Sequence, residues 1–175
     1  MSHPGPLPQA ARLASGSKSA ARGTLDSFVQ GALVDLFAAY SVALAPVPWA
    51  SAAHGPPPDV SVAALFTHGG SRTPCKLVLS LPRALLDQMK AGEVTAVKMD
   101  WARELTSQFL GRIKNRLLTF SVRLEIGALS VLERPMVEHH RTSAIGKRLY
   151  VGRTLRGVVL ATVQGLPDDS ALSYT

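Results

Sequence analysis

The stretch DWARELTSQFLGRIKNRL, residues 100–117, decides the fold because it repeats with the period of an α-helix. Apolar side chains recur every three or four residues on one face, which comprises Ala102, Leu105, Phe109, Ile113 and Leu117. The opposite face, here named the polar ledge, comprises Asp100, Glu104, Ser107, Gly111 and Lys114. The pattern predicts one long amphipathic helix with its apolar face on a core and its polar face open to a partner surface.

Two explanations compete for the polar ledge. Glycine costs about 1 kcal/mol relative to alanine inside a helix, so Gly111 suggests a packing or functional reason. Asp100 and Glu104 are equally consistent with a purely structural role, because acidic residues stabilise the early turns of a helix. Asp100 is also a candidate N-cap.

Length and composition indicate a single folded domain with a basic surplus. The chain has 175 residues, of which 46% are hydrophobic, and a net charge of +7. Residues 1–22 contribute +3 through Arg12, Lys18 and Arg22 and contain no acid, so 16 basic and 12 acidic residues leave +4 for the rest. This surplus suits an acidic protein partner, nucleic acid or simple solubility.

Cysteine usage and hydropathy favour the cytoplasm as the expected location. Cys75 is the only cysteine, so no internal disulfide forms, which fits a reducing compartment. The sequence shows no apolar run of signal-peptide length and no stretch near the ~20 apolar residues of a membrane span.

The chain divides into a tail, one domain and a short end. Residues 1–22 are rich in Pro, Gly, Ser and Ala and are expected to be a disordered basic tail. Residues 23–166 are expected to form the domain, and residues 167–175 a frayed C-terminus. A first helix is predicted from an N-cap at Thr24 to a point before Pro46, followed by a proline-rich surface connection over 46–58.

The remaining segments predict an α+β fold in which helices pack on one face of an antiparallel sheet. A short helix is expected from Pro82 to about Lys90, and residues 134–147 are expected to form an exposed loop. The predicted strands, two of them joined by a hairpin loop, are Val60–Phe66, Lys76–Leu81, Thr119–Ile126, Ser130–Leu132, Arg148–Val151 and Val158–Gln164.

Residues 100–117 resemble the signature helix of the CheX branch of the CheC/CheX/FliY family of chemotaxis phosphatases. That helix carries Asp or Ser, then Glu, then Asn, with Gly and Lys further on. The matching positions here are Asp100, Glu104, Gly111 and Lys114. The order of elements over residues 24–165 is also similar, and a single signature helix fits CheX better than CheC. The resemblance implies a CheX-like fold and homodimerisation through sheet edges.

The resemblance further implies a partner and a reaction. The family removes the phosphoryl group from an aspartate of a CheY-type receiver domain, which supplies its own magnesium ion and lysine, so no cofactor of this chain is implied. The family glutamate, here Glu104, pairs with that lysine, and the family asparagine aims the attacking water. Phosphoryl transfer gains most from such alignment and charge placement. Asp100, Gly111 and Lys114 would then contribute to docking.

The sequence departs from the family at two places. Ser107 stands at the asparagine position, and the family's downstream proline, expected near Leu129 or Ser130, is absent. A serine hydroxyl is shorter than an amide. Gln108, whose amide has suitable chemistry, is the candidate replacement, so Ser107 or Gln108 would direct the water, although Gln108 lies about 100° round the helix from Ser107. These departures favour weakened phosphatase activity, or a non-catalytic receiver-binding protein, over a fully active enzyme.

The sequence gives less support to other functions. The second half of the chain is basic, so a nucleic-acid-binding module is the main competing class, although no exposed aromatic platform is evident. A metal site is not expected, because His139 and His140 are adjacent and because Cys75 and His68 show no recognisable ligand spacing. No Ser-His-Asp grouping, phosphate-binding glycine loop or dinucleotide motif is evident.

Overall fold

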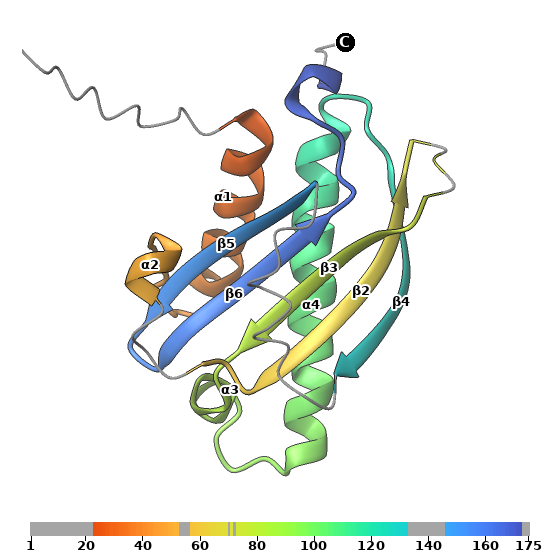
Figure 1. Ribbon diagram of the computed structural model, residues 1–175. Helices are drawn as coiled ribbons and strands as arrows, with labels where there is room; N and C mark the ends of the chain where they lie inside the picture. The colour runs from red at the N-terminus through yellow and green to blue at the C-terminus, as the bar shows by residue number, and fades with distance from the viewer. Residues whose placement is uncertain (1–22, 53–56, 70, 72, 133–145, 173–175) are drawn as a thin grey trace, which may run out of the picture.

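The computed structural model describes residues 23–52, 57–69, 71, 73–132 and 146–172. Within these ranges the elements follow one another along the chain as shown in Figure 1. They are α1 (Thr24–Ala38), β1 (Ala45–Pro46), α2 (Trp49–Ala52), β2 (Val60–His68), β3 (Cys75–Leu81), α3 (Arg83–Met89), α4 (Thr95–Leu118), β4 (Leu124–Leu132), β5 (Lys147–Thr154), β6 (Gly157–Gln164) and the short 3-10 helix η1 (Asp169–Ala171).

The six strands form one sheet in the order β1-β5-β6-β3-β2-β4, and every neighbouring pair is antiparallel. The register at the centre places Leu79 of β3 opposite both Val62 of β2 and Ala161 of β6. Because side chains alternate along a strand, these residues share one face of the sheet. The predicted α+β class with an antiparallel sheet is confirmed.

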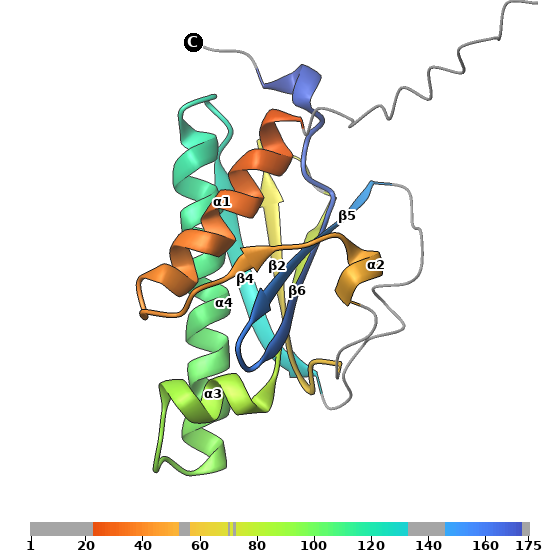
Figure 2. The ribbon, with the colours of Figure 1, turned by 90° about the vertical axis from the view of Figure 1, so that its left-hand side faces the viewer.

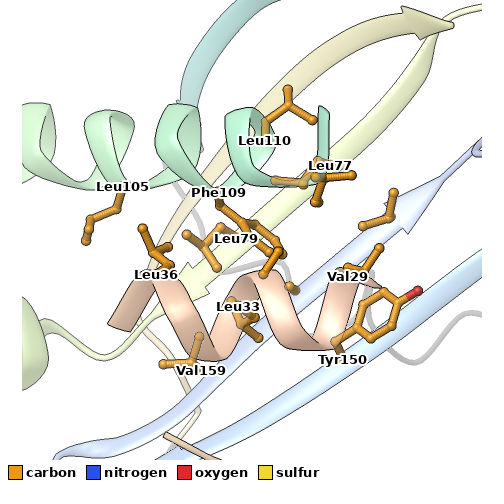
Figure 3. Packing of buried hydrophobic residues seen from close by; sticks show 14 of the residues in the cluster. Val29, Leu33, Leu36, Leu77, Leu79, Leu105, Phe109, Leu110, Tyr150 and Val159 are labelled. Atoms are coloured by element: carbon orange, nitrogen blue, oxygen red, sulfur yellow. The ribbon is translucent and has the colours of Figure 1, made fainter. Parts of the chain in front are cut away.

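The main core lies between one face of the sheet and the helices α1 and α4 (Figure 2). Figure 3 shows Leu33 and Leu36 of α1 meeting Leu105 and Phe109 of α4 above Leu79 of β3. All five side chains are fully buried. Burying a large apolar side chain contributes roughly 1.5–3 kcal/mol, so this layer fixes how α4 is rotated about its own axis.

A smaller apolar cluster lies on the other face of the sheet. Val151 of β5 and Val158 and Leu160 of β6 form it, with Val47 and Trp49 packed against them. Trp49 begins α2, which Figure 2 shows on the side of the sheet away from α1 and α4. The segment 46–58, expected to be only a surface connection, therefore carries the end of β1 and a helical turn. Pro46 is accommodated because β1 is an edge strand.

The two long helices end in the same way. The N–H of Val42 donates to the carbonyl of Phe37 at 3.0 Å, and the N–H of Val122 donates to the carbonyl of Leu117 at 3.2 Å. This six-to-one bond closes a helix when the residue before it adopts a left-handed conformation. That residue is a serine in both helices, with φ of 57° at Ser41 and 59° at Ser121.

The structure corrects the predicted starts of the two long helices. The N-cap of α1 is Gly23, not Thr24, and no side chain of the local sequence caps it. The N–H of Leu25 instead donates to Oδ1 of Asp169 in η1 at 2.7 Å, so a residue distant in sequence supplies the cap. Helix α4 begins at Thr95, so Asp100 lies in its second turn and is not an N-cap.

The predicted strands Thr119–Ile126 and Ser130–Leu132 are wrong in their bounds, because residues 124–132 form one strand. Residues 119–122 instead complete the turn that closes α4. The pairing of β4 with β2 shifts register between Ala64 and Phe66, which is a β-bulge. An extra residue in one strand of a pair is left unpaired, which interrupts the ladder locally and bends that strand.

Several expectations concern the ends of the chain and one loop. The tail 1–22 and all but the last two residues of the loop 134–147 lie outside the described residues. Within 167–175, which was expected to fray, residues 169–171 form η1 and Asp169 contacts α1. Residues 173–175 lie outside the description.

Candidate functional site

The polar ledge lies on the side of α4 that faces away from the core. Asp100 and Glu104 are exposed, and Ser107, Gly111 and Lys114 are half-buried. A methyl group built at Gly111 would meet no part of the described structure within 4 Å outside the helix's own backbone. The predicted steric opening along this face is therefore present.

Glu104 is held by a neutral neighbour and has no cation beside it. Its Oε1 accepts a hydrogen bond from Nε2 of Gln108 at 2.8 Å, one helical turn further on. No Lys, Arg or His of the described ranges lies within ion-pair distance of this carboxylate. An exposed carboxylate that is oriented but not neutralised is free to receive a cation from another molecule.

Asp100 differs from Glu104 because it already has a charged partner. Its Oδ1 lies 2.5 Å from Nη1 of Arg103, three residues on, and both side chains are largely exposed. A solvent-exposed pair of this kind contributes only about 0.2–1 kcal/mol, so a docking partner could displace it at small cost. Within the ledge, Glu104 is thus the carboxylate most available for recognition.

Tyr40 supports this arrangement from a different part of the chain. Its hydroxyl donates to Oε1 of Gln108 at 2.7 Å, so the amide of Gln108 bridges Tyr40 and Glu104. The Tyr40 ring packs edge-on against Trp101, with ring centroids 5.1 Å apart. Nζ of Lys90 lies 4.5 Å from the centre of the Trp101 ring. Aromatic pairs and cation–π contacts of this kind hold their members in a fixed orientation.

The structure separates the roles available to Ser107 and Gln108. The Gln108 amide is directed toward Tyr40 and Glu104, whereas Ser107 lies on the ledge between Glu104 and Gly111. Sequence reasoning named both residues but missed Tyr40, which lies 68 positions from Gln108. Periodicity identifies the residues that share one face of a single helix or strand. It gives no signal for a contact between the turn that follows α1 and the middle of α4.

The metal and thiol candidates lie apart from the ledge. Among the described residues, no group of three or more His, Cys, Asp and Glu side chains gathers as a metal site would require. His139 and His140 are not among them. Cys75 is buried, its Sγ donates to the carbonyl of Gly165 at 3.0 Å, and burial raises the pKa of its thiol. A neutral thiol is a poor nucleophile.

Three of the arginines are paired with carboxylates of the same molecule. Arg116 pairs with Asp35, and Arg148 pairs with Asp26 and Asp168. The same holds for Arg83, which pairs with Asp59. These pairs neutralise the three arginines locally but leave the net charge of +7 unchanged, so nucleic acid stays the competing class. In the described part of the chain, no helix combines the length and the apolar character needed to cross a membrane.

Comparison with known proteins gives a result at the level of structure. No family model and no curated protein matches the sequence. A chemotaxis protein CheX from Vibrio vulnificus superposes with a TM-score of 0.66 at 16% identity, over 83% of this chain and 99% of that one. A CheX from Desulfovibrio desulfuricans gives a TM-score of 0.59 at 11% identity, over 79% and 97% of the two chains.

A third solved structure, the complex of CheX, CheY, BeF3 and magnesium from Borrelia burgdorferi, matches with a TM-score of 0.54. The identity is 7%, over 80% of this chain and 94% of that one. The three matches cover nearly the whole length of the solved chains, so they compare complete folds and not a shared fragment. The chain therefore has a CheX-like fold, as its signature helix predicted.

Proposed function

We propose that this protein docks on phosphorylated CheY-type receiver domains through the polar ledge of α4. The observation that carries the proposal is the state of Glu104, which is exposed, held by Gln108 and without a cation beside it. The CheX-like fold and the complex of a CheX with a CheY among the similar structures support a receiver as the partner. In this arrangement Glu104 contacts the lysine of the receiver's active site.

Gly111 contributes to docking because it has no side chain. Because a side chain there would stand in open space, its absence lets a partner approach the α4 backbone closely. Lys114 lies one turn beyond Gly111 and offers a positive charge to an acidic receiver surface. Asp100 marks the other end of the ledge, where its pair with Arg103 can rearrange on docking.

We further propose that hydrolysis of the receiver's aspartyl phosphate is a slow activity of the complex. Water attacks phosphorus in line, the bond between phosphorus and the aspartate oxygen breaks, and free carboxylate and inorganic phosphate result. The magnesium ion belongs to the receiver. Ser107 offers a hydroxyl toward the attacking water, while Gln108 acts as a positioning residue that orients Glu104. The short reach of serine keeps the rate low.

A turnover assay on magnesium-loaded, phosphorylated receivers tests this proposal, with binding measured in parallel on a stably phosphorylated mimic. Glu104→Gln keeps the hydrogen bond from Gln108 but removes the charge. We expect at least tenfold weaker receiver binding, because a charge-assisted hydrogen bond is worth about 1.5–3 kcal/mol. Glu125→Gln is the matched control, because Glu125 is also exposed but lies on β4.

Ser107→Asn separates catalysis from docking. We expect this variant to raise the turnover rate and to leave receiver binding within about twofold, because an amide reaches further toward the water. Binding with no turnover in either protein would reduce the function to receiver recognition. Absence of binding to any receiver would refute the proposal, and salt-dependent affinity for nucleic acid would then favour the competing class.

Homodimerisation through sheet edges stays a separate prediction, which analytical ultracentrifugation can test.

A further inference from the structure

A second polar site lies between α1 and β5, and none of its residues belongs to the polar ledge. It is a pocket of about 260 Å³ bounded by the first half of α1, by the segment that follows β1 and by β5. Pockets for drug-sized ligands span about 300–1,000 Å³, so a pocket of this volume suits a smaller molecule.

Gln30 gives the pocket an unused hydrogen-bond donor. Its side chain lines the pocket and is only 7% exposed. Its Nε2 is shielded from solvent and has no hydrogen-bond partner among the described residues. A buried donor without a partner costs about 1–3 kcal/mol, and a rotation of the amide toward the pocket would let an acceptor there remove that cost. The amide of Gln30 thus indicates a ligand with an acceptor oxygen.

Asp26 gives the pocket an unused acceptor one helical turn before Gln30. Its Oδ1 accepts from the Tyr150 hydroxyl at 2.8 Å and lies 3.0 Å from Nη1 of Arg148. Its Oδ2 receives no hydrogen bond from the described part of the chain. Burial and the neighbouring carboxylate raise the pKa of Tyr150, so its phenol stays protonated and continues to donate to Asp26. Oδ2 remains available to a ligand donor.

The charges and the apolar wall narrow the ligand class. Arg148 and Asp26 neutralise one another, so the pocket favours neither a simple anion nor a simple cation. It presents donors at Gln30 and Arg148 beside an acceptor at Asp26. Val47 and Trp49 line another side with apolar surface. A molecule that carries an ammonium group, a carboxylate and an apolar substituent on one carbon atom matches these three features together.

We propose that this pocket binds a small zwitterion of the α-amino acid class. The ligand carboxylate accepts from Gln30 and Arg148, its ammonium group donates to Oδ2 of Asp26, and its apolar side chain lies against Trp49 and Val47. The site is independent of receiver docking, since it shares no residue with the polar ledge.

Calorimetric titration of the full chain with L-leucine and with L-phenylalanine tests the inference. We expect saturable binding of at least one of them. We also expect at least tenfold weaker binding of N-acetyl-L-leucine, which lacks the ammonium group, and of L-leucinamide, which lacks the carboxylate. These analogues need no variant. Absence of saturable binding up to about 20 mM overturns the proposal, as does equal binding of the analogues.

A pair of variants tests the placement of the ligand. Gln30→Leu should weaken binding at least tenfold while leaving the melting temperature unchanged or higher, because it removes an unpaired amide. Gln88→Leu is the control on α3, and it should leave binding unchanged. In Trp101→Phe, Trp49 is the single tryptophan of the chain, so its fluorescence should change on binding. Unaltered binding in Gln30→Leu, or unaltered Trp49 fluorescence at saturation, overturns the assignment to this pocket.

Discussion

Helices α1 and α4 cover the same face of the sheet and end with the same serine turn, but their glycines have opposite surroundings. A methyl group built at Gly31 of α1 would overlap the guanidinium of Arg116, which reaches across from α4. A methyl group built at Gly111 of α4 would meet open space. The first glycine is explained by a contact within the fold, and the second has no such explanation.

The same contrast extends to the acidic residues of the two helices. Asp26 and Asp35 of α1 are paired with Arg148 and Arg116. Glu104 of α4 has only the neutral Gln108 beside it. The carboxylates of Asp26 and Asp35 in α1 are therefore neutralised within the molecule, while the polar ledge of α4 keeps a glycine and a carboxylate available. Exposed groups without an internal role are where an external role is to be sought.

The largest expected effect comes from filling the glycine of α1. Gly31→Leu should lower the free energy of unfolding by about 2 kcal/mol, because displacing Arg116 from the Phe28 carbonyl and overpacking the contact between α1 and α4 cost more than the roughly 1 kcal/mol that leucine gains over glycine in a helix. Urea denaturation followed by circular dichroism measures this change. An unaltered midpoint would mean that the contact of Arg116 with α1 does not account for the glycine.

Removal of the Tyr150 hydroxyl should have the next largest effect and should depend on pH. At pH 7, Tyr150→Phe should be less stable by about 1.5 kcal/mol, because Asp26 loses a hydrogen bond. The pKa of Tyr150 is raised in the folded protein, so the unfolded chain releases this proton first once the pH passes about 10. The stability that Tyr150 contributes is then lost as pH rises.

The difference between the wild type and Tyr150→Phe should therefore narrow above about pH 10. Lysines titrate in the same range, but their contribution is common to both proteins and cancels in the comparison. A difference that stays constant from pH 7 to pH 11 would show that the Tyr150 proton is not linked to folding.

The cap of α1 by a distant residue should have an effect of about 1 kcal/mol. Asp169→Ala removes the acceptor for the Leu25 N–H and should lower stability by that amount, which is typical for loss of an N-cap. Asp168→Ala is the neighbouring control, since its one ion pair within the described ranges is with Arg148, at 3.5 Å. Equal effects of the two variants in thermal unfolding would argue against a specific cap.

The smallest expected effect has the opposite sign and completes the comparison. Gly111→Ala should raise the free energy of unfolding by about 0.5–1 kcal/mol, because alanine favours helix and meets no obstacle there. Denaturant titration measures the gain. If receivers dock on the ledge, the same variant should weaken their binding despite its higher stability. A loss of stability would place Gly111 in the same class as Gly31.

The sequence predicted the signature helix and most strands because their periodicity is local. Leu105 and Phe109 recur with helical period, and the short apolar run from Val60 to Phe66 is typical of a buried strand. The predicted bounds of β4 were wrong, because the turn at Ser121 was included in the first predicted strand and the bulge at residues 127–128 was taken as a break between two strands. The cap at Thr24 was wrong because Asp169, far along the chain, supplies it.

The sequence by itself determined which residues share the polar ledge, since a helix places residues three and four apart on one side. Only the tertiary structure decided which of their neighbours are engaged. The hydrogen bonds from Tyr40 to Gln108 and from Tyr150 to Asp26 join residues 68 and 124 positions apart. Packing of the whole core positions such contacts, and no local pattern carries them. For that reason the sequence could predict Glu104 as a candidate binding residue. Only the fold shows that none of the described Lys, Arg and His residues forms an ion pair with its carboxylate.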